Sequence, residues 1–153
     1  LRYEDALRLL EEKGVHVPWG GDLGGDEETI LSESFHLPLI IHRYPREAKP
    51  FYMKDDRADP RVVLNLDVLA PEGYGEIIGG SQREDDLVRL LQKMEEQGVP
   101  SEDLKWYVDL RRYGSAPHGG FGLGVERTLS WICGLGHVRE AIPFPRMMHR
   151  LYP

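Results

Sequence analysis

The spacing of apolar residues along the chain first predicts three amphipathic helices. Residues 3–13 carry apolar side chains at helical intervals and end before Gly14, a residue type that often follows a helix C-terminus. Residues 84–96 repeat this pattern and its glycine ending. A third helix is predicted to begin at Ser101, as its N-cap residue, and to end near Gly114.

Shorter apolar runs predict β-strands between these helices. Residues 37–41 and 51–53 each predict one strand, and residues 62–69 predict the clearest one. The turn-forming residues 71–74 then predict an antiparallel hairpin with a strand at 75–79. Strands grouped together with helices inserted between them indicate an α+β fold, with an antiparallel sheet flanked by helices.

Two polar residues, Asn65 and Asp67, interrupt the apolar strand at 62–69. A buried polar group costs free energy unless it is paired, so two interpretations stay open. The side chains line a wet cleft, or they lie on a solvated face of the sheet. The acidic segment 22–28 is interpreted as solvated chain leading into a short helix, and not as a metal site.

The segment 119–127 combines four glycines with alternating apolar residues and ends on Glu126 and Arg127. It predicts a strand with one smooth face, a helix over 125–133 and a last helical turn at 137–142. The guanidinium of Arg127 could stack on an aromatic ring or neutralise phosphate oxygens. The alternative is close strand–helix packing, with Arg127 in an ion pair with Glu126.

Glu76 and Arg83 are candidates for binding a small ligand. In an extended strand they lie about 23 Å apart, so we expect a bend at Gly79 and Gly80 to bring them closer. A carboxylate beside phosphate oxygens suits Mg²⁺, and an arginine suits a carboxylate or amide oxygen. The residues alone equally allow a surface ion pair, either between Glu76 and Arg83 or between Glu84 and an arginine.

Composition limits the class of protein. The chain has 153 residues, 41% hydrophobic and 29% charged, which fits one globular domain. Its net charge of −7 argues against binding a polyanion unaided. The single cysteine, Cys133, excludes an internal disulfide, and no apolar span or signal peptide is found, so we expect a cytoplasmic protein without membrane attachment. The six histidines are scattered singly, without a His-x-x-x-His spacing, which argues against a zinc site.

Several blocks in one order resemble the class II aminoacyl-tRNA synthetases. Residues 122–127, Gly-Leu-Gly-Val-Glu-Arg, resemble motif 3 of that family. The order and spacing resemble the asparaginyl enzymes of the aspartyl/asparaginyl/lysyl subclass over nearly the whole chain. The other matching blocks are residues 51–54, 75–84, 106–114, 117–118 and 144–146.

The resemblance implies an ATP site in motif 3. Gly124, Val125, Glu126 and Arg127 match its ATP-binding positions, with Arg127 stacking on the nucleotide. Glu76 matches the ligand of the Mg²⁺ that bridges the ATP phosphates, so Glu76 and Arg127 are the expected catalytic residues.

The resemblance also implies an amino-acid site. Arg83 matches the residue that binds the amino-acid side chain. Gly79 belongs to the same site, and aspartyl relatives often carry serine there, so Gly79 favours the asparaginyl branch. His118 is interpreted as structural more readily than as a nucleotide contact.

The expected domain is one partial catalytic domain over residues 1–153, with motif 3 at 119–134. Motif 1, the Phe-Arg-x-Glu block of motif 2 and an N-terminal anticodon-binding domain are not found in this sequence, and position 1 is leucine. We therefore expect a fragment that carries part of the site and is inactive alone.

The implied activity is asparagine–tRNA ligation. The carboxylate of asparagine attacks the α-phosphorus of ATP, and the aminoacyl group then passes to tRNA(Asn), in an enzyme that is a homodimer when intact. Three alternatives stay open: a relative that makes free asparagine, an aspartyl-tRNA synthetase, and a non-catalytic module that binds amino acid or nucleotide.

Overall fold

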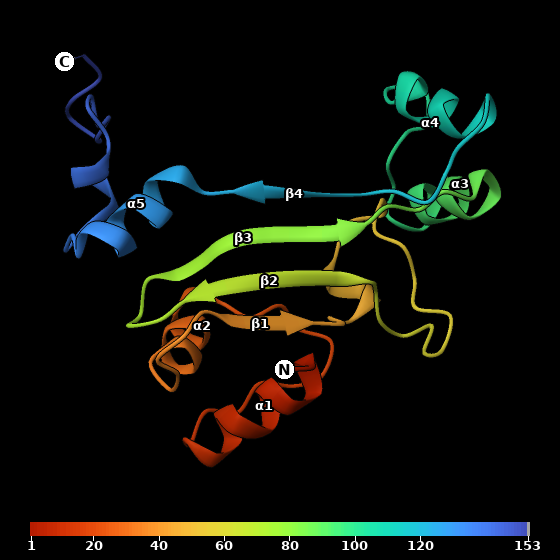
Figure 1. The fold of residues 1–153 in the computed structure, drawn as a ribbon. Helices are drawn as coiled ribbons and strands as arrows, with labels where there is room; N and C mark the ends of the chain where they lie inside the picture. Colours follow the sequence, from red (N-terminus) through yellow and green to blue (C-terminus); the bar gives the residue numbers. More distant parts are fainter. Residues whose placement is uncertain (153) are drawn as a thin grey trace.

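The computed structural model describes residues 1–152 and confirms the α+β class. Figure 1 shows a twisted sheet with helices at its sides and ends. The helices are α1 (Tyr3–Glu12), α2 (Gly25–Ser32), α3 (Leu87–Glu96), α4 (Lys105–Arg112) and α5 (Val125–Cys133), with 3₁₀ turns η1 (Arg46–Ala48) and η2 (Val138–Ala141). The strands are β1 (Leu39–His42), β2 (Asn65–Ala70), β3 (Gly75–Gln82) and β4 (Gly119–Leu123).

The strands form one antiparallel sheet in the order β1-β2-β3-β4. The predicted hairpin between β2 and β3 is confirmed. Its turn needs left-handed backbone, which Glu72 adopts at φ 63° and Gly73 at φ 80°. The chain then leaves the sheet for α3 and α4 before it returns as β4 against β3, so the glycine-rich strand completes the sheet.

The larger core lies between the sheet and the first two helices, which Figure 1 shows on the β1 side. The predicted helix at 3–13 is confirmed as α1, and its apolar stripe is buried. The short helix predicted after the acidic loop is confirmed as α2. The fully or almost fully buried members of this core are Tyr3, Ala6, Leu10, Leu23, Leu31, Leu39, Ile41, Tyr44 and Leu69.

A second core holds α3 against α4, beyond one end of β3 (Figure 1). The stripe predicted at 84–96 is confirmed, with Leu90 and Met94 buried. The helix begins later than expected because Asp86 caps it: its Oδ1 accepts a hydrogen bond from the Arg89 N–H at 2.7 Å. Ser101 is not a helix cap. Residues 101–104 form turns, and α4 starts only at Lys105.

The strand predictions need three corrections. Residues 51–53 are not a strand, because the Met53 N–H donates to the Pro50 carbonyl in a turn and only one bridge, to Arg83, reaches the sheet. The strand predicted at 37–41 is shifted to β1, where Ile40 is half exposed. The strand predicted at 62–69 begins as β2 at Asn65, after residues that form isolated bridges.

The motif at the C-terminal end is confirmed as a strand–helix unit. β4 leads directly into α5, which covers residues 125–133 as predicted, and Gly134 ends the helix in the left-handed conformation at φ 63°. The expected last turn is η2. Figure 1 shows α5 beyond the end of the sheet opposite to α3 and α4.

Candidate functional site

A β-bulge decides which face of the sheet carries Glu76. Asp67 pairs with Gly79 and Val68 with Ile78, but Leu69 pairs with Glu76, so one extra residue stands in β3. Directly paired residues of antiparallel strands point to the same face, and regular alternation would put Glu76 and Gly79 on opposite faces. The bulge therefore brings Glu76 to the face that holds Gly79 and Asp67.

This face is hollowed into a pocket of about 510 Å³. Glu76, Gly79 and Arg83 all line it, so the candidate ligand residues of β3 share one cavity. The predicted bend at Gly79 and Gly80 is wrong, because β3 is continuous from Gly75 to Gln82. The pocket instead extends along β3 and so reaches both Glu76 and Arg83. Its other lining residues are Asp22, Ala48, Lys49, Pro50, Tyr52, Met53, Asp67, Gly80 and Gly122.

The ion pair considered between Glu76 and Arg83 does not form within the described residues 1–152. Arg83 Nη1 instead donates to Ser81 Oγ at 2.5 Å, and its guanidinium lies 4.7 Å from the centre of the Tyr52 ring. Both groups hold the guanidinium at one end of the pocket, with Glu76 at the other.

Lys49 is a pocket residue that sequence reasoning missed. Its Nζ lies 3.0 Å from Asp22 Oδ1 and 3.1 Å from Asp67 Oδ2. Burial lowers the pKa of this ammonium, but the two carboxylates outweigh burial and raise the pKa above its ordinary value. The three residues come from separate segments, and no spacing in the sequence joins them.

The open question about Asn65 and Asp67 has a different answer for each residue. Asp67 lines the pocket, so the cleft interpretation is correct for it. Asn65 is buried, and its Oδ1 accepts a hydrogen bond from the Tyr44 N–H at 3.0 Å. Asn65 thus ties β2 to the segment after β1. The face carrying these two polar residues is the covered one, while Leu66 on the opposite face is 38% exposed.

Glu76 lies in an acidic environment. Burial raises the pKa of its carboxyl, and the negative charge of Asp67 raises it further. Glu28 of α2 is close by, because its Oε2 accepts a hydrogen bond from the Glu76 N–H at 3.2 Å. Burial likewise raises the pKa of Glu28, with the charge of Glu76 acting in the same direction. A cation beside Glu76 would relieve this repulsion.

Arg127 stands next to this acidic group at the start of α5. Its Nη1 donates to the Glu76 carbonyl at 2.8 Å, and the Gly124 N–H donates to the Ile77 carbonyl at 2.8 Å. The ion pair considered between Arg127 and Glu126 is not among the salt bridges of residues 1–152. The bulge at Ile77 is therefore anchored by the start of α5.

A second hollow, of about 410 Å³, opens beside Arg127. Of the four residues expected to bind ATP, Gly124, Glu126 and Arg127 line it, while Val125 does not and is largely exposed. Ile77 also lines it, and so do Val138 and Ile142 around η2, which were not anticipated. Glu76 and Gly122 line this hollow as well as the first pocket, so the two cavities adjoin.

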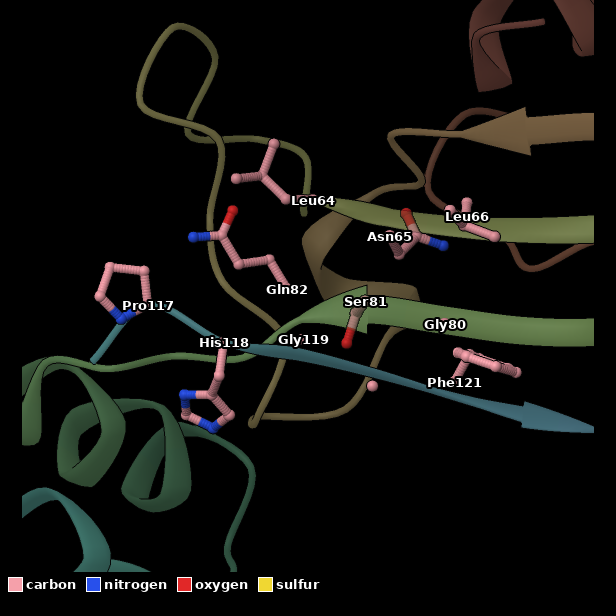
Figure 2. A pocket seen from close by; sticks show the side chains of 11 residues that line it. Leu64, Asn65, Leu66, Gly80, Ser81, Gln82, Pro117, His118, Gly119 and Phe121 are labelled. Carbon is pink, nitrogen blue, oxygen red and sulfur yellow. The ribbon is translucent and has the colours of Figure 1, made fainter. Parts of the chain in front are cut away.

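A third hollow lies on the opposite face of the sheet, and Figure 2 labels Leu64, Leu66, Pro117, His118 and Phe121 among the residues that line it. His118 lies away from Arg127. Its Nδ1 is 2.8 Å from the Ala116 carbonyl and its Nε2 is 3.3 Å from Arg111 Nη2. These contacts support the structural interpretation of His118.

Two tests of the described residues bear on metals and membranes. No group of three or more His, Cys, Asp or Glu side chains within 1–152 is arranged to hold a metal ion on its own. Mg²⁺ commonly takes one or two carboxylates and completes its shell with substrate phosphates, so Glu76 still fits this role. Among the described helices, none has the length and apolarity to cross a membrane.

Comparison with known proteins gives the family. The model of the class II tRNA synthetases (D, K and N) matches residues 2–148. The chain belongs to this family. The resemblance drawn from the motifs is thereby confirmed, and the class II fold explains the antiparallel sheet with motif 3 at its edge.

Asparagine–tRNA ligases match this class II chain over its whole length. That of Desulforamulus reducens is 60% identical over 153 residues, which are 36% of its own length. The asparaginyl-tRNA synthetase of Pyrococcus horikoshii, also solved with asparaginyl-adenylate, is 57% identical with a TM-score of 0.96, over 99% of this chain and 36% of that one. The aspartyl-tRNA synthetase of Entamoeba histolytica is 32% identical with a TM-score of 0.92, and the match covers 100% of this chain and 32% of that one. The chain thus spans about a third of the length of these relatives.

Proposed function

We propose that the intact protein activates asparagine with ATP to form asparaginyl-adenylate and transfers the asparaginyl group to tRNA(Asn). The observation that carries this proposal is the pair of adjoining cavities on one sheet face. One cavity ends at Arg83 and the other at Arg127, with Glu76 between them. A relative of the same fold was solved with asparaginyl-adenylate, a ligand of that two-part shape.

Arg83 is the proposed ligand of the amino-acid side chain, because its guanidinium lines the first pocket and can donate to an amide oxygen. Gly79 leaves the floor of this pocket open beside Glu76. The amino acid then extends from Arg83 toward Glu76, so that its carboxylate approaches the second cavity.

Arg127 and the residues Gly124 and Glu126 are the proposed ATP contacts, since they line the second cavity. Val125 joins them in motif 3 only through its backbone, because its side chain points out of the cavity lining. Glu76 is the proposed Mg²⁺ ligand, and the ion would neutralise charge on the ATP phosphates. Arg127 and Glu76 are thus the proposed catalytic residues.

The reaction needs no covalent enzyme nucleophile. The carboxylate of asparagine attacks the α-phosphorus of ATP in line, pyrophosphate leaves, and the adenylate then passes its asparaginyl group to the terminal ribose of the tRNA. The residues of this chain contribute by positioning both substrates and by neutralising charge. They form one partial catalytic domain over 1–153 of a cytoplasmic, homodimeric enzyme.

A second candidate is an enzyme that activates aspartate, as an aspartyl-tRNA synthetase or as a relative that makes free asparagine. The fold of the Entamoeba histolytica aspartyl enzyme supports it. The charge of the pocket favours asparagine, because the carboxylates of Asp22, Asp67 and Glu76 outnumber the cations of Lys49 and Arg83. A non-catalytic binding module is the remaining alternative.

The test is amino-acid-dependent exchange of pyrophosphate into ATP with Mg²⁺, with asparagine and aspartate assayed separately. We expect exchange with asparagine in the intact gene product and none with the 153-residue chain alone. Exchange with aspartate would select the second candidate. Absence of exchange with either amino acid in the intact protein would leave the binding module.

A further inference from the structure

The guanidinium of Arg83 is held from three directions. Ser81 Oγ accepts from Nη1 at 2.5 Å, and the Tyr52 ring lies below the guanidinium plane at 4.7 Å. Gly120 pairs directly with Ser81 across β3 and β4. A Cβ atom at Gly120 would stand 3.2 Å from Nη2 and 3.6 Å from Nε, closer to Nη2 than nearly all real contacts. A side chain at Gly120 would therefore displace the guanidinium by a few tenths of an ångström.

These contacts limit how Arg83 can meet a ligand. An arginine recognises a carboxylate best with two parallel N–H groups along one edge of its fork. Ser81 accepts a hydrogen bond on the Nη1 side, and the edge of Nε and Nη2 lies against Gly120. Ser81 therefore takes one of the five N–H groups, and the Nε and Nη2 edge lies close to Gly120. A carboxamide oxygen needs one N–H, so these contacts restrict it less than a carboxylate that needs two parallel N–H groups.

The second cation of the pocket is also engaged. Lys49 bonds to both Asp22 and Asp67, so its charge is already matched by protein carboxylates. A ligand with a side-chain carboxylate would bring one more negative charge beside Asp67, and Arg83 would be the only lining cation not already paired with a carboxylate of the described residues. A neutral amide avoids this cost.

We propose that Ser81 and Gly120 are positioning residues that favour an amide over a carboxylate side chain, by fixing the orientation in which Arg83 offers its remaining N–H groups to the ligand. The inference rests on the proposed function and adds two residues that touch Arg83 from the two strands beside it. Ser81 directs one N–H away from the ligand. Gly120 keeps the guanidinium close to the sheet.

The test compares Ser81→Ala and Gly120→Ala in the intact protein by pyrophosphate exchange, with KM and kcat determined for asparagine, aspartate and ATP. We expect the ratio of kcat/KM for asparagine over aspartate to fall by roughly three- to tenfold in each variant, the effect of one hydrogen bond. The KM for asparagine should rise while the KM for ATP stays unchanged. Ser32→Ala is the control, since Ser32 is equally buried but bonds only within α2.

Each outcome decides the matter. Equal losses with asparagine and aspartate, or a ratio within twofold of the wild type, would overturn the positioning role. If circular dichroism shows that Ser81→Ala does not fold, Gly120→Ala decides, because it moves the same guanidinium without removing the hydroxyl. Wild-type protein that does not activate asparagine would overturn the proposed function and this inference together, which is a distinguishable result.

Discussion

Gly79 carries no side chain at a point where the Glu76 carboxylate occupies the space above the sheet. A Cβ atom there would stand 2.4 Å from Glu76 Oε1, a separation that real structures do not show. The carboxylate would have to turn away, although the backbone at Gly79 tolerates a side chain because its φ is not positive. Gly79 thus acts on the site through Glu76.

We predict that Gly79→Ser lowers pyrophosphate exchange by roughly ten- to hundredfold, because it displaces Glu76, the proposed Mg²⁺ ligand, from its place in the site. Its melting temperature should change little, since the contact is with the end of a flexible side chain. A titration of Mg²⁺ at fixed ATP measures the effect. Gly25→Ala is the control, because nothing lies within 4 Å of a Cβ atom at that exposed position. Unchanged Mg²⁺ dependence would contradict this role of Gly79.

At the scale of elements, α3 owes its first turn to one side chain. The carboxylate of Asp86 accepts from the Arg89 N–H, one of the donors that have no partner inside the helix. We predict that Asp86→Ala lowers the free energy of unfolding by about 1 kcal/mol. Urea denaturation measures the change. Glu95→Ala, an exposed change in the same helix, should stay within about 0.5 kcal/mol, and equal losses would rule out a special role for Asp86.

The same helix is tied to the loop at 54–61 by Asp55. Its carboxylate accepts hydrogen bonds from Lys93 at 2.7 Å and from Arg89 at 2.6 Å. Burial raises the pKa of Asp55, but these two cations outweigh burial and hold it below its ordinary value of 3.8. A carboxyl with a lowered pKa in the folded state stabilises the fold above pH 3.8, and this stability is lost as the pH falls through the lower folded-state pKa.

We therefore predict that Asp55→Asn reduces the melting temperature more at pH 7 than at pH 3. Melting curves of wild type and variant between these values measure the difference. Asp26→Asn, on the exposed start of α2, is the control, and it should change the melting temperature by the same amount at pH 7 and at pH 3. An equal loss for Asp55→Asn at both pH values would show that its ion pairs do not contribute to acid sensitivity.

At the scale of the whole molecule, one face of the sheet and the C-terminal helix α5 expose apolar side chains to solvent in this chain. Phe121 is 71% exposed and Ile40 50%, and Leu66 and Leu123 accompany them on the same face of the sheet. Exposed apolar patches of this kind are interaction surfaces or promote aggregation. The two adjoining cavities lie on the other face, while the hollow in Figure 2 lies on this one.

We predict that the 153-residue chain, expressed alone, binds a hydrophobic dye and self-associates. Phe121→Ser should reduce dye fluorescence and light scattering, because it removes the most exposed aromatic ring of this face. Val88→Ser is the control, since Val88 is 75% exposed but lies apart on α3. Equal effects of the two variants would mean that this sheet face does not mediate the dye binding and self-association.

Much of this protein follows from sequence because it depends on near neighbours. The helix at 125–133 and the hairpin between β2 and β3 depend on local spacing and turn chemistry, and both were predicted. The residues Arg83, Glu76 and Arg127 were selected from motif blocks, and the structure brings them to adjoining cavities.

Other features were decided by tertiary structure alone. The bulge at Ile77, which turns Glu76 to the face of Gly79, comes from pairing with β2 and from the bond between Gly124 and the Ile77 carbonyl. Lys49 receives its carboxylate partners from segments 27 and 18 residues away. Apolar periodicity reports which residues are buried, but it carries no information on which distant polar groups meet, because that depends on strand register and loop packing.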